Sequence, residues 1–150
     1  MLLHIGAEQT DVAVGTSAQP QALHALPIGF ERTAREHFRT TPPTPLAMEN
    51  TITTVEDHVM PLHRVLPREA RLFTQDAALR DIALLAGAVA GQALSLEAME
   101  RCFDDLTAVV LGTPAARLGV PDTQAFAATL LILREFMHHM QFAQLEVLAP

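Results

Sequence analysis

A polar turn between two apolar runs near the amino terminus has the residue types of an anion-binding loop. Residues 2–5 and 12–14 form the apolar runs, and the six residues between Ile5 and Val12 read Gly-Ala-Glu-Gln-Thr-Asp. Backbone N–H groups exposed in such a turn can hold a phosphate, and a hydroxyl or carboxylate at its edge can hold a metal ion or orient water. Glu8, however, places a negative charge where the anion would sit. The turn is thus either a phosphate loop or a hairpin that keeps only its shape.

Glutamate and histidine near the carboxyl end form a candidate metal site. Glu135 precedes His138 and His139 by three and four positions, which share one face of a helix, so the side chains can reach a common point. The adjacent histidines diverge by about 100° around a helix of about 3.6 residues per turn, however. A solvated histidine pair at a helix end is therefore the simpler interpretation. His58 and His63 are five positions apart and need a bend in the chain to share a ligand.

Other catalytic patterns are missing from the sequence. It contains no Gly-x-Ser-x-Gly elbow, no P-loop and no carboxylate pair at a spacing diagnostic of acid/base catalysis. Cys102 has no histidine beside it, and we expect a packed thiol there. The acidic pairs at 56–57 and 104–105 fall on polar faces of expected helices, where we expect them to be solvated.

Composition limits the class of protein. A chain of 150 residues with 49% hydrophobic content is one domain, 1–150, able to bury roughly two-thirds of its unfolded surface. The net charge is −7, all ten basic residues are Arg, and no basic cluster suits nucleic acid. We expect no signal peptide, because Gly6, Glu8 and Asp11 stand where its apolar run would be. The longest apolar stretch, 82–94, is shorter than the about 20 residues of a membrane span. We expect a soluble, cytoplasmic protein with neither nucleic-acid nor membrane partners.

In the first half of the chain, hydrophobic periodicity and turn residues predict the helices and strands that position the candidate side chains. A helical period covers 29–38. Thr44 and Pro45 have the residue types of an N-cap and a first helical position, and the helix they open runs to about residue 66 with a kink or split at Pro61. Apolar clusters broken by turn residues predict three strands in a meander, at 2–5, 12–14 and 23–28.

The second half of the chain reads as helices between short strands. Gly87 and Gly91 fall inside one helix, where small residues permit close packing; Ser95 can cap the next helix, and Asp122 or Thr123 the last. The last helix is apolar around most of its circumference, so we expect it to be central. The expected elements are a strand at 71–73, helices at 77–94, 96–110 and from 124 onward, and a closing strand at 145–148.

Several stretches, in order and spacing, resemble the second half of the exopolyphosphatase and guanosine pentaphosphate phosphatase (Ppx/GppA) family, within the actin and sugar-kinase superfamily. Each motif is weak alone, and their order carries the resemblance. They are residues 4–11 against the family's Asp-Ile-Gly-Gly-Gly-Ser-Thr-Glu, Leu-Pro-Ile-Gly at 26–29, Pro-Pro-Thr-Pro at 42–45, residues 72–79 at the second Gly-Gly-Thr loop, and the helix openings at 94–97 and 118–122.

The resemblance implies an α/β half-domain of the ribonuclease-H-like, actin-like ATPase type, with a three-stranded antiparallel meander extended by short parallel strands and packed with helices. In the complete family this half closes over a first half, and phosphate is hydrolysed in the cleft with Mg²⁺ and a glutamate of the first half. His4 stands where the family has a metal-serving Asp, so it joins Glu135, His138 and His139 as a weak metal candidate. The phosphate-binding positions implied here are Gly6, Thr10, Asp11 and Thr74.

The departures from the family motif are informative. Two loop glycines are Ala7 and Glu8, the loop serine is Gln9, and the second loop has lost both glycines and gained Asp76. A carboxylate in a desolvated loop repels phosphate by several kcal/mol, on the order of the Coulomb energy at a few Å. We therefore predict no catalytic residues and no cofactor.

The predicted function is that of a stand-alone, degenerate exopolyphosphatase-like domain acting as a non-catalytic structural or regulatory binding module. A homodimer mate or another protein would cover the face left by the missing first half, since large apolar patches are unusual on soluble monomers. One alternative is a polyphosphate or guanosine pentaphosphate hydrolase, using Mg²⁺, whose cleft is completed by a dimer mate or a separate first half. Another is an actin-like adaptor of division or pilus assembly.

Overall fold

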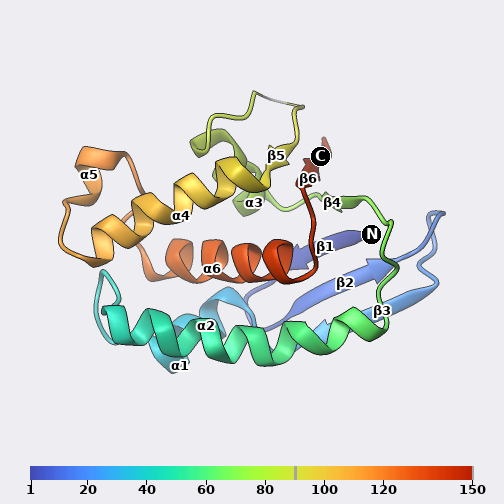
Figure 1. Cartoon of the computed structure of the whole chain (residues 1–150), viewed down its shortest axis with the longest axis horizontal. Coiled ribbons are helices and arrows are strands. Elements are labelled where there is room, and N and C mark those ends of the chain that lie inside the picture. Colours follow the sequence, from blue (N-terminus) through green and yellow to red (C-terminus); the bar gives the residue numbers. More distant parts are fainter. Residues whose placement is uncertain (90, 150) are drawn as a thin grey trace.

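A six-stranded mixed sheet organises the fold (Figure 1). We describe it from a computed structural model, which covers residues 1–89 and 91–149. The strand order is β3-β2-β1-β4-β6-β5, with antiparallel β1, β2 and β3, parallel β4 and β6 beside β1, and an antiparallel β5 at the edge. The strands are β1 (Leu2–Ile5), β2 (Thr10–Val14), β3 (Ala22–Leu26), β4 (Leu72–Thr74), β5 (Leu94–Ser95) and β6 (Gln144–Val147). The predicted meander with parallel extensions is confirmed.

Side-chain alternation gives the meander one buried face. Leu3 pairs with Val12 in register, and both are fully buried. Leu2, its partner Ala13 and the next residue across the sheet, Leu23, lie on the opposite face and are partly or fully exposed. The register therefore also fixes His4 opposite Asp11 on that same open face, at the end of β1 that leads into the polar turn.

Helices α1 (Phe30–His37) and α2 (Pro45–Val59) follow the meander, as the sequence predicts. The Thr44 hydroxyl accepts a hydrogen bond from Ala47 N at 3.1 Å, and Pro45 occupies the first turn, which confirms the predicted cap. The chain changes to a 3₁₀ helix, η1 (Met60–Arg64), at the residue before Pro61. Proline lacks the N–H that an α-helix interior needs, which explains the split.

The helix predicted over 77–94 is much shorter in the structure. Helix α3 spans Ala77–Leu85, and Gly87 and Gly91 have φ angles of +89° and +84°. Those angles lie in the left-handed region that favours glycine, so Gly87 ends the helix, and Gly91 lies in the loop beyond it. The predicted packing role of Gly87 and Gly91 is therefore wrong.

Helix α6 (Gln124–His139) is the central helix, as predicted. It packs against α1, α2 and α4 (Leu96–Val110), and Figure 1 shows it running between α4 and α2. Its residues from Ala127 to Leu133 are buried without interruption. Ser95 and Thr123 accept N-cap hydrogen bonds from Ala98 N and Phe126 N, each at 3.1 Å. A short helix, α5 (Ala115–Leu118), which the sequence reading did not include, links α4 to α6.

The length and polarity of the helices bear on membrane insertion. Across residues 1–89 and 91–149, none of the helices is long and apolar enough to cross a membrane.

Candidate functional site

The polar turn after β1 is bonded to the start of α1. Phe30 N donates to Gly6 O at 2.9 Å, and Glu31 N and Arg32 N both donate to Ala7 O at 3.0 Å. The first N–H groups of a helix have no partner within the helix and form a ready anion site. Here the carbonyl oxygens of the turn occupy them, and Gly29 supplies no side-chain cap. The turn thus caps α1 itself.

Gly29 permits the close approach between the turn and α1. A Cβ atom at this buried position would lie 2.3 Å from Ala7 O and 2.4 Å from the Glu8 carbonyl carbon. Any other residue would push the turn away from the helix and break the bonds to Gly6 O and Ala7 O. The Leu-Pro-Ile-Gly segment that ends β3 therefore positions the turn by backbone contact.

Glu8 is neutralised by α1. The Arg35 guanidinium donates to both Glu8 carboxylate oxygens, at 3.1 and 3.0 Å. This hydrogen bonding, with the positive charges of Arg35 and Arg32, lowers the pKa of the exposed Glu8 carboxyl below its ordinary value of 4.5. Among the described residues, Arg35 is the one arginine whose guanidinium bonds to the turn, and this bidentate pair with Glu8 occupies it.

Asp76 from the second loop reaches across to the end of β1. Its carboxylate accepts a hydrogen bond from Ile5 N at 2.8 Å and lies 2.6 Å from His4 Nδ1. Asp76 is the N-cap residue of α3, yet its side chain does not cap that helix because it is turned towards β1. A carboxylate of the protein therefore occupies the space between the two loops.

The predicted phosphate-binding residues lie around these contacts. Thr10 is fully buried, and its hydroxyl donates to Ile28 O at 2.6 Å. Thr74 is also fully buried, with its hydroxyl accepting from Asp76 N at 3.1 Å. Asp11 accepts from the Gln9 amide at 2.8 Å, and Gly6 N donates to Gln9 O at 2.9 Å. The structure brings the four residues to one end of the sheet, and their binding of phosphate stays a prediction.

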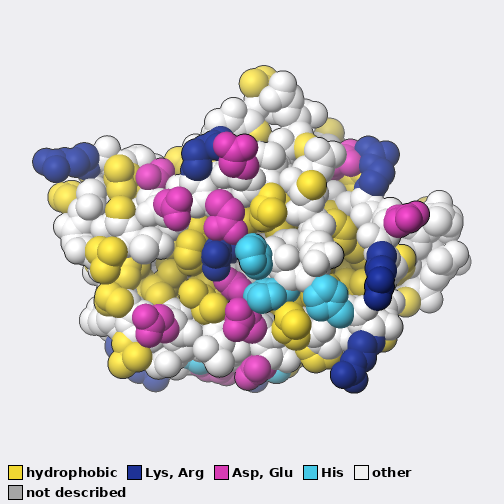
Figure 2. Space-filling model, in the orientation of Figure 1, with side chains coloured by type: hydrophobic (Ala, Val, Ile, Leu, Met, Phe, Trp, Pro, Cys, Tyr) yellow, Lys and Arg dark blue, Asp and Glu magenta, His cyan; other side chains and the backbone are white. Residues whose placement is uncertain are grey.

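A second polar cluster lies where α6 meets α2 and α4. His139 Nε2 is 2.9 Å from Glu56 Oε1 and 3.0 Å from Glu135 Oε2. Arg134 donates to Glu135 Oε1 at 2.7 Å and to Glu100 at 3.0 Å. Figure 2 shows acidic, basic and histidine side chains gathered over α6 on this face.

Sequence reasoning found only part of this cluster. Glu135 and His139 come together, as their four-residue spacing predicts, whereas His138 is exposed and lies 3.5 Å from Glu100. Glu56, which we expected to be solvated, is the missing member, and it lies on another helix. Of the described residues, this is the one group of three or more potential metal ligands that converges, and neither His58 nor His63 takes part.

Cys102 is a packed residue, as expected. It lies in the core, and burial, helped by the charge of Asp105, raises the pKa of its thiol to about 11. At neutral pH the group is protonated, which leaves little thiolate for nucleophilic chemistry.

Comparison with known proteins shows the fold. No protein-family model and no curated protein sequence matches the chain. The structure is similar to an Aquifex aeolicus PPX-GPPA enzyme, with a TM-score of 0.76 at 18% identity over 97% of this chain and 52% of that chain. It is also similar to the type II variant of the Aquifex aeolicus Ppx/GppA phosphatase, with a TM-score of 0.75 at 16% identity over 98% of this chain and 52% of that one.

An exopolyphosphatase from Cytophaga hutchinsonii gives a TM-score of 0.71 at 14% identity, over 99% of this chain and 52% of that chain. This chain spans about half the length of each of these structures. Its fold is similar to about half of the chain in these Ppx/GppA and exopolyphosphatase structures.

Proposed function

We propose that this domain is a non-catalytic binding module whose two loops hold the fold together instead of holding phosphate. The observation that carries the proposal is the position of the Asp76 carboxylate, which bonds to Ile5 N and His4 between the loops. A phosphate in that space would have to displace a negative group that is already hydrogen-bonded.

The charges around the loops support the same proposal. Glu8, Asp11 and Asp76 bring three carboxylates to this end of the sheet. Like unit charges about 4 Å apart near a protein surface repel by roughly 4 kcal/mol. The guanidinium of Arg35 is committed to Glu8, and that of Arg32 bonds to Glu36 at 2.9 Å. A phosphate would meet net repulsion here.

The binding surface that we propose is the outer side of α3. One apolar hollow of about 500 Å³ lies between α3, α1 and α6, and its lining includes Phe30, Ile82, Leu85 and Phe126. Leu84 is 49% exposed and lines this hollow and a second one. Adjoining apolar surface of this kind is typical of protein contacts.

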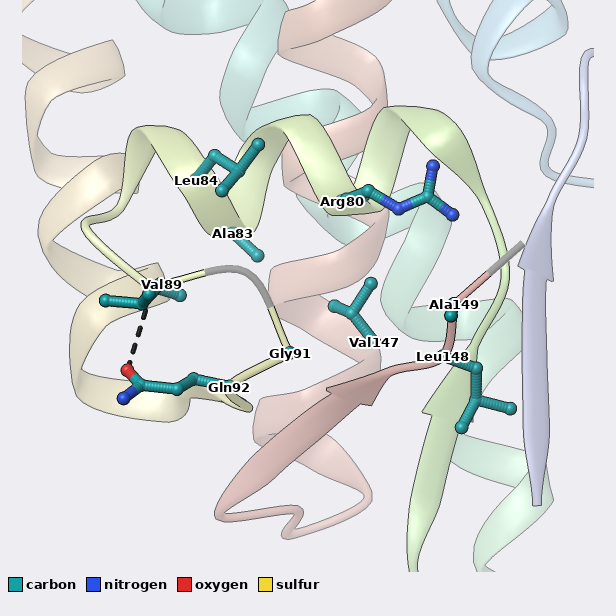
Figure 3. Close-up of a pocket in the computed structure, with 10 residues that line it drawn as sticks. Arg80, Ala83, Leu84, Val89, Gly91, Gln92, Val147, Leu148 and Ala149 are labelled. Carbon is teal, nitrogen blue, oxygen red and sulfur yellow. Dashed lines mark hydrogen bonds between the residues drawn. The ribbon is translucent and has the colours of Figure 1, made fainter.

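The second hollow, of about 220 Å³, lies between α3 and β6. Figure 3 shows Ala83 and Val147 on opposite sides of it, with Val89 N bonded to the Gln92 side chain at its rim. Its lining is almost entirely apolar, so a polar ligand gains little there and a hydrophobic side chain of a partner fits. The partner that we propose is a protein with an apolar face, of which a second copy of this chain is the simplest.

Ligand binding and hydrolysis test the first part of the proposal. We expect a thermal-shift panel with Mg²⁺, polyphosphate, nucleotides and guanosine polyphosphates to leave the melting temperature unchanged, because a bound ligand would raise it. We also expect no phosphate release from polyphosphate. Hydrolysis that is lost in Asp11→Asn, while the variant stays folded, would contradict the proposal and favour a cleft completed by a partner.

Light scattering after size exclusion tests the partner surface. We expect the wild type to associate, and Leu84→Arg to weaken the association because it places a charge at a position that lines both hollows. Leu46→Arg is the control, since Leu46 is 65% exposed on α2 and lines neither hollow. A wild-type monomer that stays monomeric at high concentration would count against self-association.

A further inference from the structure

Three side chains converge where α2 packs against α6. They are Glu56 of α2 and the Glu135–His139 pair of α6, and one ligand atom from each lies within 4.8 Å of the other two. His139 Nε2 lies 2.9 Å from Glu56 Oε1 and 3.0 Å from Glu135 Oε2. An imidazole and two carboxylates are ordinary ligands of divalent transition metals.

This cluster has fewer hydrogen-bond donors than acceptors at the His139 ring nitrogen. Nε2 carries at most one hydrogen, in either the neutral or the charged imidazole, yet it faces two carboxylate oxygens at hydrogen-bond distance. One N–H cannot point well at both acceptors. A metal ion in place of that hydrogen would bind both carboxylates and the ring nitrogen at once.

Burial and charge strengthen the preference for a cation. Glu135 is only 1% exposed, so its negative charge needs compensation. The cluster holds three carboxylates, of Glu56, Glu100 and Glu135, and among the described residues one guanidinium, that of Arg134, which bonds to Glu100 and Glu135. A divalent cation would neutralise the remainder.

The surroundings of Glu135 also fit a metal ligand. Arg134 holds Oε1 at 2.7 Å and so leaves Oε2 directed at His139. Metal-binding carboxylates are typically fixed in this way by a hydrogen bond to the oxygen that does not bind the metal. The Arg134 guanidinium is itself held 4.6 Å above the Phe103 ring.

We propose that Glu56, Glu135 and His139 bind a divalent transition-metal ion of the zinc class, which fastens α2 to α6. Ligands about 2.1 Å from zinc at angles of about 90° to 110° lie roughly 3.0 to 3.4 Å apart, close to the two distances seen here. The side chains of Glu56 and His139 are 39% and 23% exposed, so water can reach the ion and complete its coordination. The site is separate from the loops and from the binding surface on α3, and does not depend on either.

Binding of Zn²⁺ and Co²⁺ to the untagged full chain tests the site. We expect one ion per chain by titration calorimetry, together with visible Co²⁺ absorption bands of a low-symmetry site. Because the metal replaces the hydrogen on Nε2, calorimetry in buffers of different ionisation enthalpy will report release of a proton at a pH where that nitrogen carries one. The ion will also raise the melting temperature, since it binds only the folded chain.

Three variants locate the ion. His139→Gln keeps an N–H group near the position of Nε2 but offers no ligand nitrogen, and Glu56→Gln keeps the shape of its side chain. Each will bind Zn²⁺ at least about tenfold more weakly and lose the Co²⁺ bands. His138→Ala is the matched control, because His138 is the neighbouring exposed histidine, and it will bind as the wild type does.

The proposal fails if the wild type binds neither ion at tens of micromolar. It also fails if binding survives in a folded His139→Gln, or is lost in His138→Ala, since both results describe adventitious surface binding. Thermal unfolding without metal identifies any variant that has lost its fold, and in that case the conservative His139→Asn takes the place of His139→Gln.

Discussion

The loop cluster around Asp76 and the helix cluster around Glu135 both set carboxylates against a histidine, and they differ in how the charges are satisfied. In the loops each carboxylate has its own partner, Asp76 with Ile5 N and His4, and Glu8 with Arg35. In the helix cluster one imidazole nitrogen is shared by two carboxylates, one of them fully buried. The first arrangement gives each of these carboxylates its own partner, whereas the second keeps negative charge for a cation.

The comparison teaches that the number of free donors decides what a polar cluster binds. Residue types alone favour the loops, because they resemble a phosphate site. The helix N-terminus beside them, however, is capped by Gly6 O and Ala7 O, and those bonds use the first N–H groups of α1, which could otherwise hold an anion. The helix cluster resembles no motif, yet its two carboxylate oxygens share a single imidazole nitrogen, an arrangement that favours a bound cation.

The largest effect that we predict comes from Gly29→Ala, which disrupts the contact between the turn and α1. The new Cβ would lie 2.3 Å from Ala7 O, so the turn must leave α1 and its capping bonds break. We expect a loss of at least about 3 kcal/mol in the free energy of unfolding, measured with denaturant.

Gly15→Ala is the matched control for Gly29→Ala, because its nearest contacts are 3.3 Å and a small shift accommodates them. We expect it to change the stability by less than about 1 kcal/mol. Equal losses in the two variants would show that the contact between the turn and α1 is not what holds the loops.

Arg134→Met tests the charge of the helix cluster. Burial alone would lower the pKa of Arg134, but its hydrogen bond to Glu100 and the charges of Glu135 and Glu100 raise it. Removing the guanidinium leaves the buried Glu135 with His139 as its remaining partner, and we expect a loss of about 2 kcal/mol in unfolding experiments. Added Zn²⁺ will restore part of that stability if the cluster binds a cation.

Arg101→Met is the control for Arg134→Met, because Arg101 forms an exposed pair with Glu97 four positions before it on α4. Exposed pairs of this kind contribute little. If Arg101→Met destabilised the chain as much as Arg134→Met, the loss would reflect the charge of α4 and not the buried carboxylate.

Sequence reasoning predicted the local features of this fold and missed the long-range partners. Thr44, Ser95 and Thr123 cap their helices as predicted, because an N-cap bond depends on residues two or three positions away. Family resemblance supplied what periodicity could not, the parallel strands beside the meander. The predicted length of α3 was wrong, because a run rich in alanine and leucine favours a helix and nothing in that pattern shows that Gly87 takes a left-handed conformation and ends it.

The candidate sites were harder to predict, since each depends on which helices are neighbours. Glu135 and His139 share one helix, so their spacing revealed them, but nothing in the sequence places Glu56 beside them. Asp76 was identified only as an extra negative charge, and its bond to Ile5 N follows from the parallel pairing of β1 and β4. Side-chain partners that are far apart in sequence can be identified only when the packing of the elements is known.

Asp76→Ala should have a moderate effect on the loops. It removes the acceptor of Ile5 N and the partner of His4, and a lost acceptor at a largely buried site reduces the stability by about 1 to 2 kcal/mol. Asp76→Asn is the control, because its amide oxygen can still accept from Ile5 N, and it will lose less than about 1 kcal/mol. Equal losses in chemical unfolding would show that the charge of Asp76, and not the hydrogen bond, joins the loops.

Glu8→Gln should have the smallest effect, since both members of the Glu8–Arg35 pair are exposed. We expect no measurable change in the melting temperature at neutral pH. Because Arg35 lowers the pKa of Glu8 in the folded chain, any contribution of the pair is present above the unfolded-state pKa, ordinarily 4.5. It disappears as the pH falls through the folded-state pKa, so wild type and variant must converge in acid and in high salt. Pyrophosphate binding is the sharper test. Because Gly6 O and Ala7 O cap α1, we expect that neither protein binds pyrophosphate. Binding to Glu8→Gln but not to the wild type would mean that the loop still offers donors and that Glu8 alone blocks them.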